Sequence, residues 1–204
     1  RAIASAAPGP AVSLSYCLSA DALNWSLRGR APIAASVRGN LRANYGFDGM
    51  TFDDLKLFRS IKSKLTGHGE SHLNPEGVLL SNGPLGSSVG QAQGLAIGDK
   101  LAKRDRVTVL VVSDGASMEG EAKEAFTAIP GLAAKDRINP FLLILSDNDT
   151  KLSGRITKDS FSMQRAFQSM GALGWNVISV PNGHDLQAVY LSVEKGIAPA
   201  RCLS

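Results

Sequence analysis

Two strand-like runs of apolar residues are each followed closely by polar residues whose oxygen atoms can bind a metal ion. Asp114 follows the run at residues 107–112, and Asn148 and Thr150 follow the run at residues 141–145. In an open parallel sheet, ligands bind at the carboxyl ends of the strands, and neighbouring strands lie about 4.8 Å apart. Carboxylate, amide and main-chain carbonyl oxygens suit magnesium and leave positions for phosphate oxygens and water. The spacing therefore predicts a site for magnesium and a diphosphate.

Glycine-rich stretches could bring main chain to the same ligand. Residues 66–70 read Thr-Gly-His-Gly-Glu, residues 82–86 read Asn-Gly-Pro-Leu-Gly, and Gly115 directly follows Asp114. Glycine has no Cβ, so its backbone can come close to a flat ring or a phosphate. These stretches are candidates for a second set of loops facing the site.

The elements that must position these residues follow the order of a parallel α/β sheet. Pro130 and Gly131 are expected to end the second helix, and Asp185 is expected to cap the last one. The pattern predicts an α/β fold with a doubly wound, mostly parallel sheet and helices on both faces. The expected helices lie at residues 87–98, 119–129, 161–173 and 185–195, and the expected strands at residues 107–112, 141–145, 175–180 and 200–203.

The composition is that of an ordinary globular protein. The 204 residues are 44% hydrophobic and 20% charged, and a chain of this size buries roughly 70% of the surface that it exposes when unfolded. We expect one domain over residues 1–204, in which residues 1–45 are ambiguous. Residues 52–61 are expected to form a helix with Thr51 as its N-cap.

Charge and cysteine content exclude several classes of protein. The 22 basic and 18 acidic residues are mixed along the chain, which does not indicate a nucleic-acid-binding protein. No apolar stretch reaches the roughly 18 residues of a membrane span, and Pro8 interrupts the apolar start that could resemble a signal sequence. Cys17 and Cys202 have no partner spacing, so a cytoplasmic, reducing setting fits best.

The ordered motifs together resemble the diphosphate-binding domain of the transketolase family of thiamine diphosphate enzymes. The resemblance runs from about residue 45 to residue 204 and implies the thiamine-diphosphate-binding fold. It is carried by Gly67-His68-Gly69-Glu70, Gly83-Pro84-Leu85-Gly86, Ser113-Asp114-Gly115, Glu119-Gly120 and the stretch Asp-Asn-Asp-Thr-Lys-Leu-Ser-Gly at residues 147–154.

This resemblance implies a role for each matching residue. Asp114 and Asn148 would bind magnesium, or calcium, through their side chains, and Thr150 through its carbonyl. The other implied roles are contact with the diphosphate for Gly115, with the aminopyrimidine for Gly83, with the thiazolium for Leu85, with substrate for His68, and a place near the subunit interface for Glu119.

The implied reaction is transfer of a two-carbon ketol unit between sugar phosphates, as in the pentose phosphate pathway, with the cofactor supplying the carbon–carbon chemistry. In the family, the glutamate that activates the aminopyrimidine belongs to a pyrimidine-binding domain, which is absent from these residues. We therefore expect a partner domain or subunit, in a homodimer or heterotetramer, and little activity from this chain alone.

Two alternatives stay open. One is another thiamine diphosphate enzyme, such as deoxyxylulose phosphate synthase or a 2-oxoacid dehydrogenase component, although Glu119-Gly120 and the intact Gly-Pro-Leu-Gly motif favour transketolase. The other is a catalytically silent assembly or regulatory subunit. It is motivated by departures from the family pattern: no histidine precedes His68, Ser113 replaces a glycine, and Gly69 replaces a proline.

Other chemical readings of the same residues are weaker. His68, Glu70 and His72 lack the further ligand expected of a zinc site. His184 fits a turn before the last helix better than a catalytic role. Residues 83–90 lack the Lys-Ser/Thr of a phosphate-binding loop for nucleoside triphosphates.

Overall fold

The computed structural model describes residues 2–6, 14–18, 56–57, 60–63, 71–72, 80–81, 83–151 and 154–197. The chain divides into two compact units, one made of Arg1–Leu18 with Leu85–Ser204 and the other of Ser19–Pro84. In the second unit, the main-chain N–H of Ser71 donates a hydrogen bond of 3.0 Å to Ser81 Oγ. The single domain expected over residues 1–204 stays a prediction.

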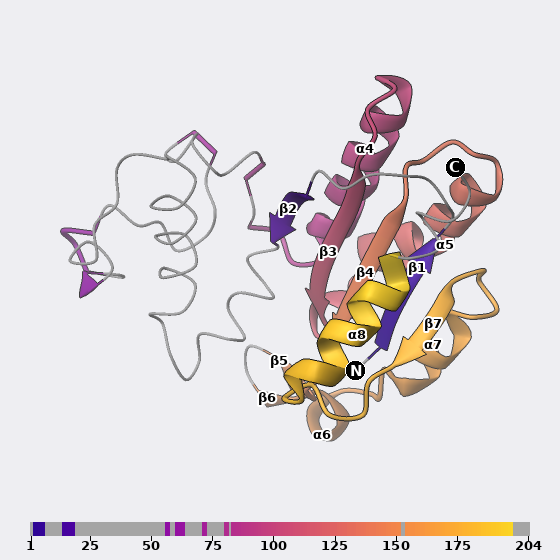
Figure 1. The fold of residues 1–204 in the computed structure, drawn as a ribbon. Coiled ribbons are helices and arrows are strands. Elements are labelled where there is room, and N and C mark those ends of the chain that lie inside the picture. The colour runs from indigo at the N-terminus through magenta and orange to yellow at the C-terminus, as the bar shows by residue number, and fades with distance from the viewer. Residues whose placement is uncertain are drawn as a thin grey trace. The chain divides into compact units, whose positions relative to one another are not determined.

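The first unit is built on a five-stranded sheet in the order β2-β3-β4-β1-β7 (Figure 1). Strands β2, β3 and β4 are parallel, whereas β1 runs antiparallel to both β4 and β7. The predicted mostly parallel sheet is therefore confirmed, and its one reversed strand comes from the ambiguous first residues. The strands are β1 (Ala2–Ala6), β2 (Leu14–Leu18), β3 (Val107–Ser113), β4 (Phe141–Ser146) and β7 (Asn176–Ser179).

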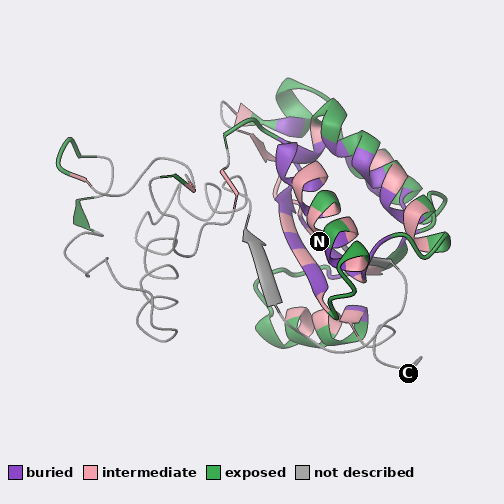
Figure 2. Ribbon diagram, turned by 90° about the horizontal axis from the view of Figure 1, so that it is seen from above, coloured by how far each residue is buried: buried purple, intermediate pink, exposed green. Residues whose placement is uncertain are grey.

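Helices cover both faces of this sheet, as a doubly wound fold requires. Alternate residues of β4 point to opposite faces, so Leu143 joins one buried cluster and Leu142 joins another. The first cluster also takes residues of α4 (Ser87–Leu101), α5 (Gly120–Ala134) and α7 (Gln164–Ser169), and the second takes residues of α8 (Leu186–Ile197). In Figure 2, buried residues gather along the sheet and on the helix sides that face it.

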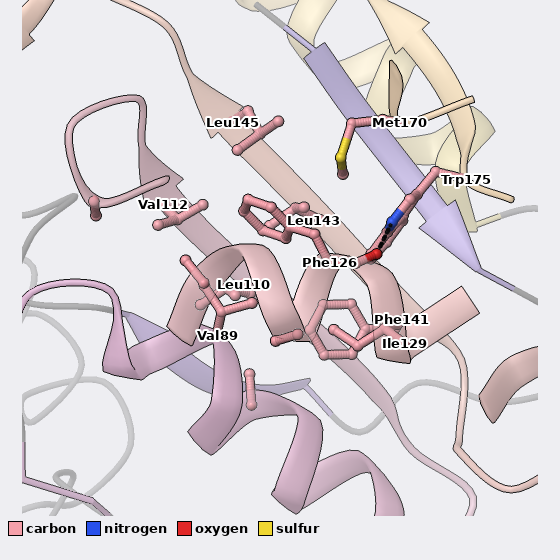
Figure 3. Close-up of a cluster of buried hydrophobic side chains, with 14 of the residues drawn as sticks. Val89, Leu110, Val112, Phe126, Ile129, Phe141, Leu143, Leu145, Met170 and Trp175 are labelled. Carbon is pink, nitrogen blue, oxygen red and sulfur yellow. Dashed lines mark hydrogen bonds between the residues drawn. The ribbon is translucent and has the colours of Figure 1, made fainter. Parts of the chain in front are cut away.

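Pro130 does not end α5, contrary to the sequence prediction. The helix continues to Ala134 with Pro130 inside it and buried. Proline has no N–H, so the carbonyl of Phe126, four residues earlier, loses its helical partner. The indole Nε1–H of Trp175 donates to this carbonyl at 2.7 Å, as the dashed line in Figure 3 shows. A side chain from a distant part of the sequence therefore lets the helix tolerate its proline.

Several helix boundaries in the structure also differ from those predicted from the sequence. Helix α4 extends three residues beyond its predicted end, and the helix predicted at residues 161–173 is confined to α7. A short helix that was not predicted, α6 (Ile156–Asp159), precedes it. Asp185 does cap α8, because its Oδ1 accepts the N–H of Ala188 at 3.0 Å.

The remaining predictions lie at the edges of the described residues. The strand predicted at residues 200–203 and most of the helix at residues 52–61 lie outside them. Ile61, the predicted end of that helix, is described as a fully exposed turn residue instead. In the described ranges, no helix combines the length and the apolar character needed to cross a membrane.

Candidate functional site

The carboxyl ends of β3 and β4 lie level with one another. Ser113, the last residue of β3, pairs with Ser146, the last residue of β4, and the N–H of Asp114 donates to the Ser146 carbonyl at 3.1 Å. The turn after β3 is closed by serine side chains, because Ser113 Oγ accepts the N–H of Ala116 at 3.1 Å. Ser117 Oγ donates to the Ser113 carbonyl at 2.7 Å. The serine that replaces the family glycine is thus part of the turn itself.

Asp114 is a buried carboxylate held by main-chain N–H groups. Its side chain accepts hydrogen bonds from Gly115 at 2.9 Å, Asn148 at 3.0 Å and Asp149 at 2.6 Å, and the residue is 1% exposed. Burial raises the pKa of this carboxyl, the three N–H donors oppose the rise, and the nearby carboxylate of Asp147 adds to it. No lysine or arginine among the described residues forms an ion pair with it.

The side-chain amide of Asn148 is buried beside Asp114 without a hydrogen-bond partner in the described part of the chain. Both Oδ1 and Nδ2 are in this state. A buried amide without partners costs free energy, so such a group needs an explanation. A cation at Oδ1 and an anionic oxygen at Nδ2 would supply both missing partners.

The carbonyl of Thr150 reaches the same place. A Cβ added to Gly115 would lie 3.5 Å from this carbonyl oxygen, which shows how closely the two main chains approach. Thr150 lies in the short strand β5 (Thr150–Lys151), which pairs with β6 (Gly154–Arg155). The structure therefore brings Asp114, Gly115, Asn148 and Thr150 together, and their roles as ligands stay a prediction.

A polar cleft of about 300 Å³ opens beside Asp114 and Asn148. Carboxylates from Asp147 and Asp149 also face it, and Asp147 Oδ2 accepts a hydrogen bond of 2.6 Å from Gln164 Nε2. Such a lining favours a cation or its hydration shell over a free anion. The full lining is Asp114, Asp147, Asn148, Asp149, Ile156, Thr157, Ser162, Met163 and Gln164.

Leu85 and Glu119 lie on exposed positions of the same unit. The Leu85 side chain is 47% exposed, and Glu119 is the exposed N-cap residue of α5. Gly86 lies between them with a positive φ of 83°, and a Cβ there would come 2.6 Å from the Glu119 Cβ. Only glycine fits this close approach without strain. Gly83 is exposed and belongs to the other unit, and His68 lies outside the described residues.

Asp149 also lines the cleft, although no motif of the sequence assigns it a role. It has a positive φ of 58° and links the loop to Thr157 through its carboxylate, at 2.7 Å to the main-chain N–H and 2.8 Å to Oγ1. These hydrogen bonds hold the pKa of the Asp149 carboxyl below its usual value. The available signal was the residue type, since Asn and Asp tolerate the left-handed conformation better than other residues.

Comparison with known proteins gives one consistent family. Residues 34–201 match the family model described as the transketolase, thiamine diphosphate binding domain. The chain is 32% identical to the transketolase of Rhodobacter capsulatus over 182 residues, which are 83% of this chain and 26% of that protein. It is 36% identical to the chloroplastic transketolase of Spinacia oleracea over 151 residues, or 68% of this chain and 19% of that protein.

Solved structures agree with the sequence matches. The transketolase from Leishmania mexicana superposes with a TM-score of 0.63 at 30% identity and covers 74% of this chain and 23% of its own. The transketolase of Pichia stipitis in complex with sedoheptulose-7-phosphate gives 0.64 at 26% identity, covering 77% of this chain and 24% of its own. The chain thus spans about a quarter or less of the length of these relatives.

Proposed function

The chain belongs to the transketolase family through its thiamine diphosphate binding domain, and on that premise we propose that it binds magnesium and the diphosphate of this cofactor for ketol transfer. The reaction is the movement of a two-carbon ketol unit between sugar phosphates. The relatives and solved neighbours reported above are transketolases, which supports this reaction over those of other thiamine enzymes.

The observation that carries the proposal is the pair of buried polar groups at the ends of β3 and β4. Asp114 is a buried acid with a raised pKa, and the Asn148 amide beside it has no partner in the described residues. A magnesium ion would compensate the charge of Asp114 and would take Asn148 Oδ1 as a ligand, with the Thr150 carbonyl as a third. The residues present therefore fit the group.

Residues around this site would contact different parts of the cofactor and the substrate. Gly115 would let the backbone approach the diphosphate, and Asn148 Nδ2 would donate to one of its oxygens. When bound, thiamine diphosphate supplies the carbon centre at which the ketose is cleaved. We propose that Gly83 contacts the aminopyrimidine, Leu85 the thiazolium ring, His68 the substrate, and Glu119 the subunit interface.

We also propose that the site works together with a pyrimidine-binding domain. The matched segment is the thiamine diphosphate binding domain, and the resemblance to the family implies that a pyrimidine-binding domain completes the cofactor site. A homodimer or heterotetramer would supply the second one. The Pichia stipitis neighbour was solved with a seven-carbon sugar phosphate, which supports sugar phosphates as the substrate class here.

Calorimetric titration of the chain with thiamine diphosphate tests the proposal, with and without magnesium and with and without an added pyrimidine domain from a related transketolase. We expect magnesium-dependent binding that tightens when the second domain is present. Calcium should replace magnesium, because the ligands are all oxygen atoms. No binding under any of these conditions would overturn the proposal. Binding without ketol transfer in the two-domain mixture would favour a silent assembly subunit instead.

A further inference from the structure

Asp149 lies between two proposed metal ligands and touches the third. It separates Asn148 from Thr150 in the sequence, and its own N–H donates to Asp114 Oδ2 at 2.6 Å. Its positive φ of 58° turns the chain sharply at this point. The conformation of Asp149 therefore decides how the Asn148 amide and the Thr150 carbonyl are presented to Asp114.

The side chain of Asp149 connects this turn to α6. Its Oδ1 accepts the N–H of Thr157 at 2.7 Å, and its Oδ2 accepts the Thr157 hydroxyl at 2.8 Å. Its carbonyl also accepts the N–H of Ile156 at 3.2 Å. The N-cap residue of α6, Arg155, makes no side-chain capping bond, so Asp149 takes that place from across the hairpin.

Helix α6 is itself fixed to the core. Ile156, its first residue, is 2% exposed and belongs to the hydrophobic cluster that also contains Leu145 of β4. A continuous path of contacts thus runs from the core through Ile156 and Asp149 to the Asp114 carboxylate. Such support lets a ligand loop keep its shape before the metal arrives.

We propose that Asp149 is a positioning residue for magnesium and diphosphate binding, and that it acts through its paired hydrogen bonds to Thr157. Because both of its carboxylate oxygens accept hydrogen bonds from Thr157, its action on the metal runs through the ligands Asn148 and Thr150. This inference rests on the proposed function. It goes further by assigning a role to a residue outside the proposed ligand set.

A double-mutant cycle with D149G and T157V tests this role. Glycine keeps the positive φ but removes the side chain, and valine keeps the shape of threonine but removes the hydroxyl. The readout is the dissociation constant for magnesium in the presence of thiamine diphosphate, measured by calorimetry. We expect D149G to weaken binding about 10-fold to 100-fold, the range for residues that orient metal ligands, and T157V about threefold to tenfold.

The coupling between the two changes distinguishes positioning from a general loss of stability. In the D149G background, T157V should add no further loss, because its partner is already gone. D149N keeps an acceptor for the Thr157 N–H and should restore most of the affinity. The matched control is D185N, which removes the charge of another helix-capping aspartate, and its affinity should equal that of the wild type.

Wild-type affinity in D149G, or independent additive losses in the double variant, would overturn the positioning role. The role would also be overturned if a lower melting temperature of the metal-free chain fully accounted for the lost affinity. If D149G folds poorly, the affinity and melting temperature of T157V, the milder change, are compared instead. Failure of the wild-type chain to bind magnesium and thiamine diphosphate would instead remove the proposed function, and the positioning role with it.

Discussion

Two aspartate–asparagine pairs lie at opposite ends of β3 and β4. They differ in which groups bind their side chains. Asp99, in α4, contacts arginines that precede β3, and Asn139 precedes β4. Asp114 and Asn148 follow the ends of the same two strands. Both aspartates are nearly buried, at 6% and 1% exposure. The residue types are the same, and the two aspartates are similarly buried, so the difference between the aspartates comes from their neighbours.

The side chains of Asp99 and Asn139 both have binding partners within the protein. Asp99 Oδ1 lies 3.4 Å from the guanidinium of Arg104 and 3.5 Å from that of Arg106. Asn139 Nδ2 donates to the Arg104 carbonyl at 2.7 Å, and its main-chain N–H donates to Ala96 at 3.2 Å. This pair joins the end of α4 to the start of the sheet, and its role is structural.

The pair at the end of the strands has no such cation among the described residues. Asp114 is held only by neutral N–H groups, and the Asn148 amide has no partner there. A buried charge is normally paired or coordinates a metal. The missing counter-charge, and not burial alone, therefore distinguishes the proposed binding site from the structural ion pair at the other end of the strands.

The largest effect is expected from D114N. It removes the charge that would attract the metal while keeping the size of the side chain. We expect magnesium-dependent binding of thiamine diphosphate to weaken at least about 100-fold, beyond the range for residues that only orient ligands. Calorimetry measures this, and D99N is the matched control with unchanged affinity. Equal losses in D114N and D99N would remove the distinction between the two pairs.

The next largest effect is expected from N148A, compared with N139A. Removing the Asn148 amide should weaken magnesium affinity about 10-fold or more. It should not lower the unfolding free energy of the metal-free chain, because the amide makes no hydrogen bond in the described residues. N139A should lower the unfolding free energy by about 1–2 kcal/mol, since its bond to the Arg104 carbonyl is lost, without changing affinity. Urea denaturation and calorimetry together check both; an effect of N139A on affinity would contradict the comparison.

A smaller effect is expected from D99N on stability. The arginine side chains beside Asp99 are 59% and 37% exposed, so water screens much of their attraction. We expect the unfolding free energy to fall by only about 1 kcal/mol. Urea denaturation measures this change. A loss several times larger would mean that this end of the sheet depends on the charge of Asp99 more than the exposed arginines suggest.

The smallest effect is a pH dependence that only the metal-free chain should show. Burial raises the pKa of Asp114 above its ordinary value of 3.8, so the folded chain holds this proton more tightly than the unfolded chain does. The unfolding free energy should therefore fall as the pH rises from about 3.8 through the raised pKa, and D114N should lack this component. Denaturation of both proteins across this range measures the difference, which magnesium should abolish. A difference that grows in favour of the wild type with rising pH would contradict it.

The sequence predicts the parts of this fold that depend on local pattern. Strands β3 and β4 lie within one residue of their predicted ends, because each is a continuous apolar run bounded by polar turn residues. The proximity of Asp114 and Asn148 follows from the same pattern, since both residues come just after the ends of adjacent parallel strands.

What the sequence could not predict depends on contacts between distant residues. Nothing near Pro130 indicates that a tryptophan from another element would satisfy the carbonyl that the proline leaves unbonded. The role of Asp149 likewise depends on Thr157, which reaches it only because Ile156 packs into the core. The antiparallel strand β1 comes from residues whose pattern matched neither a helix nor a strand clearly.

The hydrogen bond between Trp175 and Phe126 also restricts the order in which substitutions can accumulate during evolution. If Pro130 changes first, the new residue brings its own N–H, and the Phe126 carbonyl can accept two donors at once. If Trp175 changes first, the same buried carbonyl loses its donor while proline can offer none. We therefore expect related sequences to replace the tryptophan only where the proline has already been replaced.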